Sequence, residues 1–170
     1  MNTSGHIDIE QFGDWHRHLT YTIHPDPLVG FNFVDSADAD RYKTECINVY
    51  ICRDISDNLK DFFNNKFCSL DNLSYSIQKL QPGMLLPWHT DAYSFFCKNN
   101  KITNLDNVVR VIVFLEDWQK GHISEVDNQV NTKYKAGDWI SWRGTTPHLA
   151  ANLGHSDRYT LQITGTYKHN

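Results

Sequence analysis

The sequence predicts a mainly β protein, a jelly roll (double-stranded β-helix) with a few helices in its N-terminal part. From residue 74 onward, short stretches of alternating or continuously apolar residues are separated by turn-forming Gly, Pro, Asn and Asp. Aromatic residues, which favour strands, make up 13% of the chain. Eight short strands joined by such turns are typical of two packed antiparallel sheets that form a jelly roll.

Residues 1–73 are expected to form a mixed lead-in of strands and helices. The β-branched content of residues 47–51 predicts a short strand. Residues 54–63 predict a helix, because their apolar positions fall on one helical face and acidic residues occupy the first turn.

The jelly-roll core is expected over residues 74–167. No internal repeat, low-complexity tract or Gly/Ser-rich linker divides the sequence, so residues 1–170 are expected to form a single domain. The strands expected in the core are residues 74–80, 87–91, 108–115, 122–126, 130–134, 138–142, 148–152 and 158–166.

The composition narrows the classes of function. Hydrophobic residues make up 40% and charged residues 21% of the chain, as in ordinary globular domains. A formal net charge of −4 and the lack of any Lys/Arg run longer than a pair disfavour nucleic acid as a partner. We find no secretory leader and no apolar stretch of membrane-spanning length, and therefore expect a cytoplasmic protein without a membrane partner. Free thiols in a reducing compartment are indicated by four cysteines without metal-ligand spacing, which are Cys46, Cys52, Cys68 and Cys97.

Two histidines and one aspartate form a candidate metal site. His89 and Asp91 end one expected strand, and a spacing of two residues places both side chains on the same face of extended chain. His148 begins another expected strand after the turn at residues 145–147 and can complete the site. Two imidazoles and one carboxylate cover one face of an octahedral ferrous ion and leave the opposite face open for catalysis. The pattern therefore predicts a catalytic Fe(II) site.

Arg158 and Thr160 form a candidate anion site through the same spacing of two residues. A guanidinium and a hydroxyl on one face of a strand can both reach one carboxylate. A five-carbon diacid suits this arrangement, because one end can chelate the iron while the other reaches Arg158 and Thr160. The sequence therefore suggests 2-oxoglutarate as a cosubstrate and O2 as the oxidant.

The remaining histidines are interpreted as surface or core residues. His16 and His18 also have the spacing of two, but no carboxylate and distal histidine follow them in a matching arrangement. The same interpretation applies to His6, His24, His122, His155 and His169.

At these residues the sequence resembles the 2-oxoglutarate/Fe(II)-dependent oxygenases, and most closely their prolyl-hydroxylase-like branch. That branch has the pattern H-x-D, a distal His, and then an Arg or Lys a short distance on. The resemblance covers residues 74–167 and is carried by residues 81–91, 110–118, 136–139, 146–148 and 158–160.

The resemblance implies that His89, Asp91 and His148 ligate Fe(II), and that Arg158 binds the far carboxylate of 2-oxoglutarate with help from Thr160. It implies hydroxylation of an unactivated C–H bond with release of succinate and CO2. Ascorbate is a candidate reductant.

The sequence departs from the family pattern at one cosubstrate contact. A tyrosine found in many relatives is replaced here by apolar residues such as Leu80 and Phe114. The second contact to the cosubstrate carboxylate is therefore open, with Tyr75, Gln78 and Arg110 as candidates and a purely structural role as the alternative for each.

Residues 92–107 directly follow a candidate ligand and are longer than a simple connection requires. We expect this segment to cover the substrate; the alternative is an insertion packed on the outside of the barrel. Trp88 and Tyr159 alternate with candidate site residues along their strands, so we expect both to pack in the core.

The substrate favoured by the resemblance is a peptide or protein side chain, with proline as the first candidate. The alternatives are a free amino acid or another small metabolite. Oxidative demethylation of nucleic acid is disfavoured by the acidic net charge. A jelly-roll module that binds metal or ligand without turnover is the alternative outside enzymes.

Overall fold

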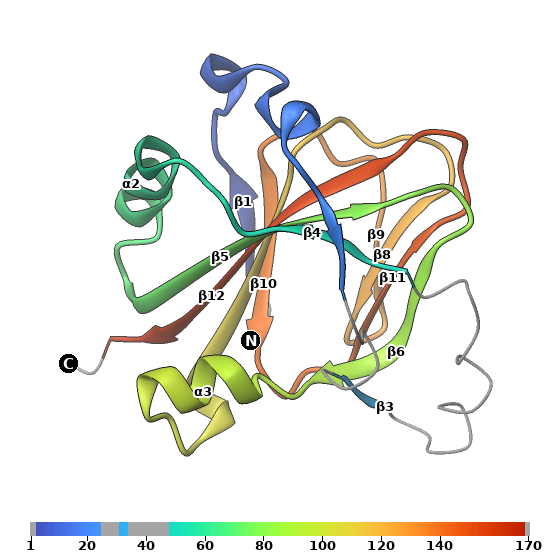
Figure 1. Ribbon diagram of the computed structural model, residues 1–170. Coiled ribbons are helices and arrows are strands. Elements are labelled where there is room, and N and C mark those ends of the chain that lie inside the picture. The colour runs from blue at the N-terminus through green and yellow to red at the C-terminus, as the bar shows by residue number, and fades with distance from the viewer. Residues whose placement is uncertain (1–2, 25–30, 34–47, 169–170) are drawn as a thin grey trace.

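The computed structural model describes residues 3–24, 31–33 and 48–168. The chain forms two antiparallel sheets that pack into a β-sandwich, which confirms the predicted jelly roll (Figure 1). The larger sheet has the strand order β1 (Thr3–His6), β10 (Asp138–Arg143), β7 (Val108–Phe114), β12 (Arg158–Tyr167), β5 (Leu70–Leu80), β4 (Tyr50–Cys52), β2 (Thr22–Ile23). The smaller sheet has the order β3 (Phe31–Phe33), β6 (Leu85–Asp91), β11 (His148–Asn152), β8 (His122–Val126), β9 (Gln129–Asn131).

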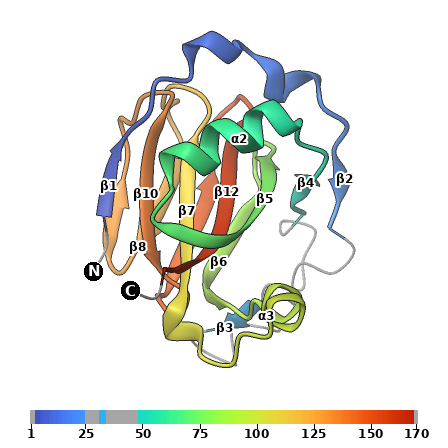
Figure 2. The same ribbon diagram turned by 90° about the vertical axis from the view of Figure 1, so that its left-hand side faces the viewer.

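The helices lie around the sandwich. Helix α2 (Asp57–Lys66) crosses the outer face of the larger sheet, as Figure 2 shows, and buries Leu59 and Phe63. Helix α3 (Ser94–Asn100) follows β6. Short 3-10 helices are formed by Glu10–Phe12, Trp15–His18 and Leu105–Asn107.

Strand alternation divides the larger sheet into two chemically different faces. Along β7, Val109, Val111 and Val113 join the apolar cluster beneath α2. Arg110 and Ile112 lie between these valines and face the other sheet, because successive side chains of a strand point to opposite faces. The outer face is therefore a hydrophobic core, and the inner face is available for polar side chains.

The expected core strands all occur, with small shifts at their ends. Strand β5 begins at Leu70, earlier than the expected residue 74, and β9 ends at Asn131 rather than at 134. Helix α2 begins and ends three residues later than expected. The lead-in is part of the sandwich, since β1, β2 and β4 extend the larger sheet and β3 pairs with β6.

The described cysteines form no disulfide: Cys52 is buried, Cys68 is exposed and Cys97 is half-buried. Cys46 and His169 lie outside the described residues. Within the described ranges, no helix has the length and apolar character needed to cross a membrane.

Candidate metal centre

The three candidate metal ligands converge on neighbouring strands of the smaller sheet. His148 at the start of β11 pairs with His89 near the end of β6. His89 Nε2 lies 3.5 Å from Asp91 Oδ1, and His148 Nε2 lies 3.8 Å from Asp91 Oδ2. One ligand atom from each residue lies within 4.8 Å of the others, and no second such group of His, Cys, Asp or Glu occurs in the described part of the chain. These three residues could hold a metal ion.

Each imidazole is oriented by the backbone of its own chain segment. His89 Nδ1 lies 2.5 Å from the carbonyl oxygen of Pro87, and His148 Nδ1 lies 3.0 Å from that of Thr146. Because a carbonyl only accepts, each Nδ1 carries the proton and donates, which leaves the lone pair on Nε2. Both Nε2 atoms face Asp91. The site therefore holds the tautomers that a metal ion needs.

The charge states of the site also suit a cation. Burial lowers the pKa of His148 to about 4, against a smaller opposing effect of Asp91. Burial alone would raise the pKa of Asp91, but Arg110 and the two imidazoles hold it well below its usual range. At neutral pH, His148 is a neutral nitrogen ligand and Asp91 a charged oxygen ligand, a donor set that fits Fe(II) or a similar divalent ion.

Asp91 has a buried partner on the opposite sheet. Arg110 of β7 donates to Asp91 Oδ2 from Nη2 at 2.6 Å and from Nε at 3.1 Å. Its Nη1 donates to Thr164 Oγ1 at 2.7 Å and to Gln162 Oε1 at 3.4 Å, and its guanidinium lies 5.0 Å from the centre of the Tyr93 ring. Arg110 therefore positions the carboxylate of Asp91 and is not among the residues that line the pocket of the other candidate cosubstrate contacts; its contact with the cosubstrate stays a prediction.

A narrow pocket between the sheets joins the triad to the candidate anion site. We call it the inner pocket, and its walls include His89, Asp91, His148, Arg158 and Thr160. Arg158 is 3% exposed and Thr160 is 1% exposed. The structure therefore brings together the five residues that the sequence singled out most strongly.

The guanidinium of Arg158 is incompletely paired. Its Nη2 donates to Ser124 Oγ, and it lies 5.9 Å from the centre of the Phe114 ring. Its Nε is buried and has no hydrogen-bond partner among the described residues, while the buried hydroxyl of Tyr134 lies near enough to the guanidinium to interact with it electrostatically. The sequence prediction missed Ser124 and Tyr134, although the alternation of His122–Val126 was a signal that Ser124 faces inward.

The remaining candidates for the second cosubstrate contact, Tyr75 and Gln78, lie in different surroundings. Tyr75 is not among the residues that line the inner pocket, and its hydroxyl donates to Asn64 Oδ1 of α2 at 2.5 Å. Gln78 lies in the inner pocket directly opposite Thr160 in the β5–β12 pairing. Gln78 is therefore the one of the three candidates that lines the inner pocket.

The aromatic residues beside the site have different roles. Trp142 is buried, and its ring centre lies 4.9 Å from that of His148. Tyr159 packs against the hydrophobic core, as expected, and so does Trp139. Trp88 is half-buried and joins none of the core clusters formed by the described residues, so its packing in the core stays a prediction.

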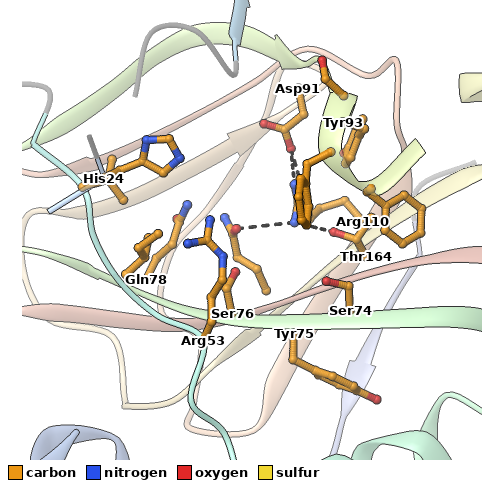
Figure 3. Close-up of a pocket in the computed structure, with 16 residues that line it drawn as sticks. His24, Arg53, Ser74, Tyr75, Ser76, Gln78, Asp91, Tyr93, Arg110 and Thr164 are labelled. Carbon is orange, nitrogen blue, oxygen red and sulfur yellow. Dashed lines mark hydrogen bonds and ion pairs between the residues drawn. The ribbon is translucent and has the colours of Figure 1, made fainter. Parts of the chain in front are cut away.

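A second, wider cavity lies on the other side of Asp91 (Figure 3). We call it the outer cleft; its volume is about 360 Å³. Residues 92–107 form one of its walls through Tyr93, Phe95 and Phe96, while Tyr93 and Phe96 also pack in a small core of their own. The segment thus flanks the cleft that it is expected to cover and is not confined to the outside of the barrel.

The other described histidines keep a structural interpretation. His16 is buried, and its Nε2 lies 2.9 Å from Glu116 Oε1. Arg17 donates to the same carboxylate oxygen, and His18 is exposed. His122 is buried, with its Nε2 3.1 Å from the carbonyl oxygen of Ser156.

The low pKa of His148 predicts a pH-dependent stability of the metal-free protein. Between its ordinary value of 6.5 and about 4, the unfolded chain takes up a proton at His148 that the folded chain does not. The stability from neutral His148 is present above pH 6.5 and is lost as the pH falls towards 4, by an amount on the order of 2–3 kcal/mol. Urea unfolding in EDTA at pH 7.0 and 4.5 should show a smaller loss for His148→Asn than for wild type. Equal losses would contradict the prediction.

Comparisons with solved structures agree on the fold. A prolyl-4-hydroxylase from Pseudomonas putida gives a TM-score of 0.52 at 14% identity, over 82% of this chain and 78% of that chain. A predicted oxalate decarboxylase from Thermotoga maritima gives 0.49 at 14% identity, over 88% and 95% of the two chains. The cupin domain of Schizosaccharomyces pombe Cnp3 gives 0.43 at 10% identity, over 69% and 64%. No family model and no curated protein matches the sequence.

At these identities the likeness concerns the fold alone. Together with the geometry above, it defines a class: a jelly-roll β-sandwich with a possible metal site of His89, Asp91 and His148.

Proposed function

We propose that the protein is an Fe(II)- and 2-oxoglutarate-dependent dioxygenase that hydroxylates an unactivated C–H bond. The observation that carries the proposal is a single pocket that joins the metal triad to Arg158, whose buried Nε has no hydrogen-bond partner among the described residues. A buried polar group without a partner is costly unless a ligand supplies one. Metal binding alone does not require this guanidinium, whereas a chelating diacid uses both ends of the pocket.

In this proposal each residue has a defined role. His89, Asp91 and His148 hold the iron and leave its other coordination positions to exogenous ligands. Arg158 and Thr160 bind the far carboxylate of 2-oxoglutarate, and Gln78 is placed to add a polar contact. The bound iron and cosubstrate supply the oxidative chemistry, which consumes O2 and releases succinate and CO2. Ascorbate is the proposed reductant for iron that becomes oxidised without substrate.

The inner pocket must widen to admit the cosubstrate. Its free volume is about 30 Å³, less than a five-carbon diacid occupies. Arg158 Nη2 donates to Ser124 Oγ in the structure, and a carboxylate at this end of the pocket can replace that acceptor. We therefore expect Arg158 to exchange Ser124 for the cosubstrate carboxylate.

The proposed substrate is a peptide or protein side chain, with proline as the first candidate, and a free amino acid or other small metabolite is the alternative. The outer cleft adjoins Asp91 and is the space from which a C–H bond can approach the metal.

The proposal is tested by anaerobic titration of the metal-free protein with Fe(II) and 2-oxoglutarate. A weak visible charge-transfer band that requires both components would establish chelation at the triad, and succinate formation in air would then establish turnover. Metal binding without this band would refute the proposal and favour a binding module without turnover.

Arg158→Met should weaken the binding of 2-oxoglutarate without weakening the binding of the metal ion. Loss of a charge-assisted carboxylate pair costs about 1.5–3 kcal/mol, which corresponds to roughly 10–150-fold in affinity. Isothermal titration of the Mn(II)-loaded variant with 2-oxoglutarate measures this effect. Ser124→Ala is the matched control, because it removes the internal partner of Arg158 and keeps the guanidinium. The affinity of this variant for 2-oxoglutarate should equal or exceed that of wild type. Unchanged affinity in Arg158→Met would remove Arg158 from the site.

A further inference from the structure

The outer cleft meets the candidate metal site at Asp91, and Arg158 is not among the residues that line it. It shares Gln78, Asp91 and Gln162 with the inner pocket, so these three side chains form the boundary between the two spaces. A molecule in the outer cleft therefore contacts the carboxylate side of the metal site directly. With a volume of about 360 Å³, the cleft falls in the size range of small-molecule sites.

The described lining residues of this cleft carry more positive than negative charge. Among them Asp91 is the only carboxylate, and Arg110 already pairs with it at 2.6 Å. Arg53, which directly follows β4, projects into the cleft beside Gln78 and Ser76 (Figure 3). No ion pair of Arg53 occurs within the described part of the chain. Within the described lining, the guanidinium of Arg53 thus has no compensating carboxylate, and it attracts anions and repels cations.

The two walls of the cleft differ in polarity. Ser74 and Ser76 of β5 face it from the sheet, because they alternate with residues that point towards α2. Tyr93, Phe95 and Phe96 line the other wall, and Phe95 is 80% exposed. An exposed phenylalanine at the edge of a cavity is an apolar surface available to a ligand.

We infer that the outer cleft binds a substrate that carries a carboxylate, with Arg53 as the anchor of that carboxylate and Phe95 as the contact for its apolar part. This inference rests on the proposed function and names the substrate class for the same site. The carboxylate belongs either to a free acid, such as an amino acid, or to an acidic side chain of a peptide. A substrate held in this way places its C–H bonds between Arg53 and Asp91, beside the metal.

Ligand-observed NMR on the protein with and without Zn(II) tests the inference, since neither state turns over. The probes are free amino acids, their C-terminal amides, and acetylated and amidated tripeptides with a central aspartate or glutamate. We expect a carboxylate-bearing probe to bind wild type and its uncharged counterpart to bind more weakly. Arg53 is exposed, and exposed pairs contribute about 0–1 kcal/mol, so Arg53→Gln should weaken the binding of the carboxylate probe by about two- to fivefold. Lys98→Gln is the matched control, because it removes an exposed positive charge from α3 that does not line the cleft.

The outcomes separate the two sources and the two proposals. Binding of free acids alone identifies a small-molecule substrate, and binding of the capped acidic peptides alone identifies a peptide. The inference is overturned if no probe binds, if the amides bind as well as the acids, or if Arg53→Gln binds like wild type. The Fe(II)/2-oxoglutarate band reports on the proposed function separately, because Arg53 does not line the inner pocket.

Discussion

Arg110→Met should destabilise the metal-free protein by about 3 kcal/mol, and a divalent metal should restore part of this loss. Asp91 and Arg110 are only 12% and 11% exposed, and their closest atoms are 2.6 Å apart. Removal of one partner from a buried ion pair leaves an uncompensated charge, which typically costs about 3–5 kcal/mol. Asp91 retains His89 and His148 nearby, so we expect the lower end of that range. A cation at the triad replaces the lost positive charge, which is the basis of the expected rescue.

The measurement is urea unfolding of wild type and variant in EDTA and in excess Mn(II). Arg17→Met is the matched control, because Arg17 contacts Glu116 at 2.6 Å while being 54% exposed. Exposed pairs contribute about 0–1 kcal/mol, so this variant should lose much less stability. Similar losses in the two variants, or a loss in Arg110→Met that metal leaves unchanged, would contradict the assigned role of Arg110.

His148→Ala should reduce metal affinity by more than about 100-fold while leaving the fold intact. Removing a residue that hydrogen-bonds to a metal ligand typically lowers metal affinity about 10–100-fold. Removing one of the three candidate ligands themselves should lower it further. The side chain of His148 is 12% exposed at the wall of the inner pocket, so its removal enlarges a space that already exists.

Competition with a fluorescent chelator for Zn(II) measures this affinity, and circular dichroism checks the fold. The control is His155→Ala, which removes an exposed histidine of a turn and should bind metal like wild type. Near-normal affinity of His148→Ala would show that the ion binds elsewhere.

The strand pattern was sufficient to predict which residues lie together in the inner pocket, namely the three candidate metal ligands and the pair Arg158 and Thr160. His89 and Asp91 share a strand face, as do Arg158 and Thr160, and a period of two is the most reliable geometric relation that an isolated sequence offers. His148 could be placed with them only through order along the chain, and the β6–β11 pairing supplies the physical reason.

Contacts between the two sheets could not be predicted in this way. Arg110 interrupts an apolar run, which indicates an inward polar residue but not its partner; only the packing of β7 against the smaller sheet selects Asp91. Tyr134 follows β9 and approaches Arg158 through packing alone.

The carbonyl two residues before each histidine ligand fixes the orientation of that ligand. In both cases the hydrogen bond stays within a three-residue segment, Pro87 to His89 and Thr146 to His148. Neither of these two hydrogen bonds involves a residue of the outer cleft. Residues that line the outer cleft, other than Asp91 and its partner Arg110, can therefore be exchanged while both backbone contacts of the imidazoles are kept. We expect this separation to make the cleft a suitable region for redesigning substrate preference while the metal chemistry is retained.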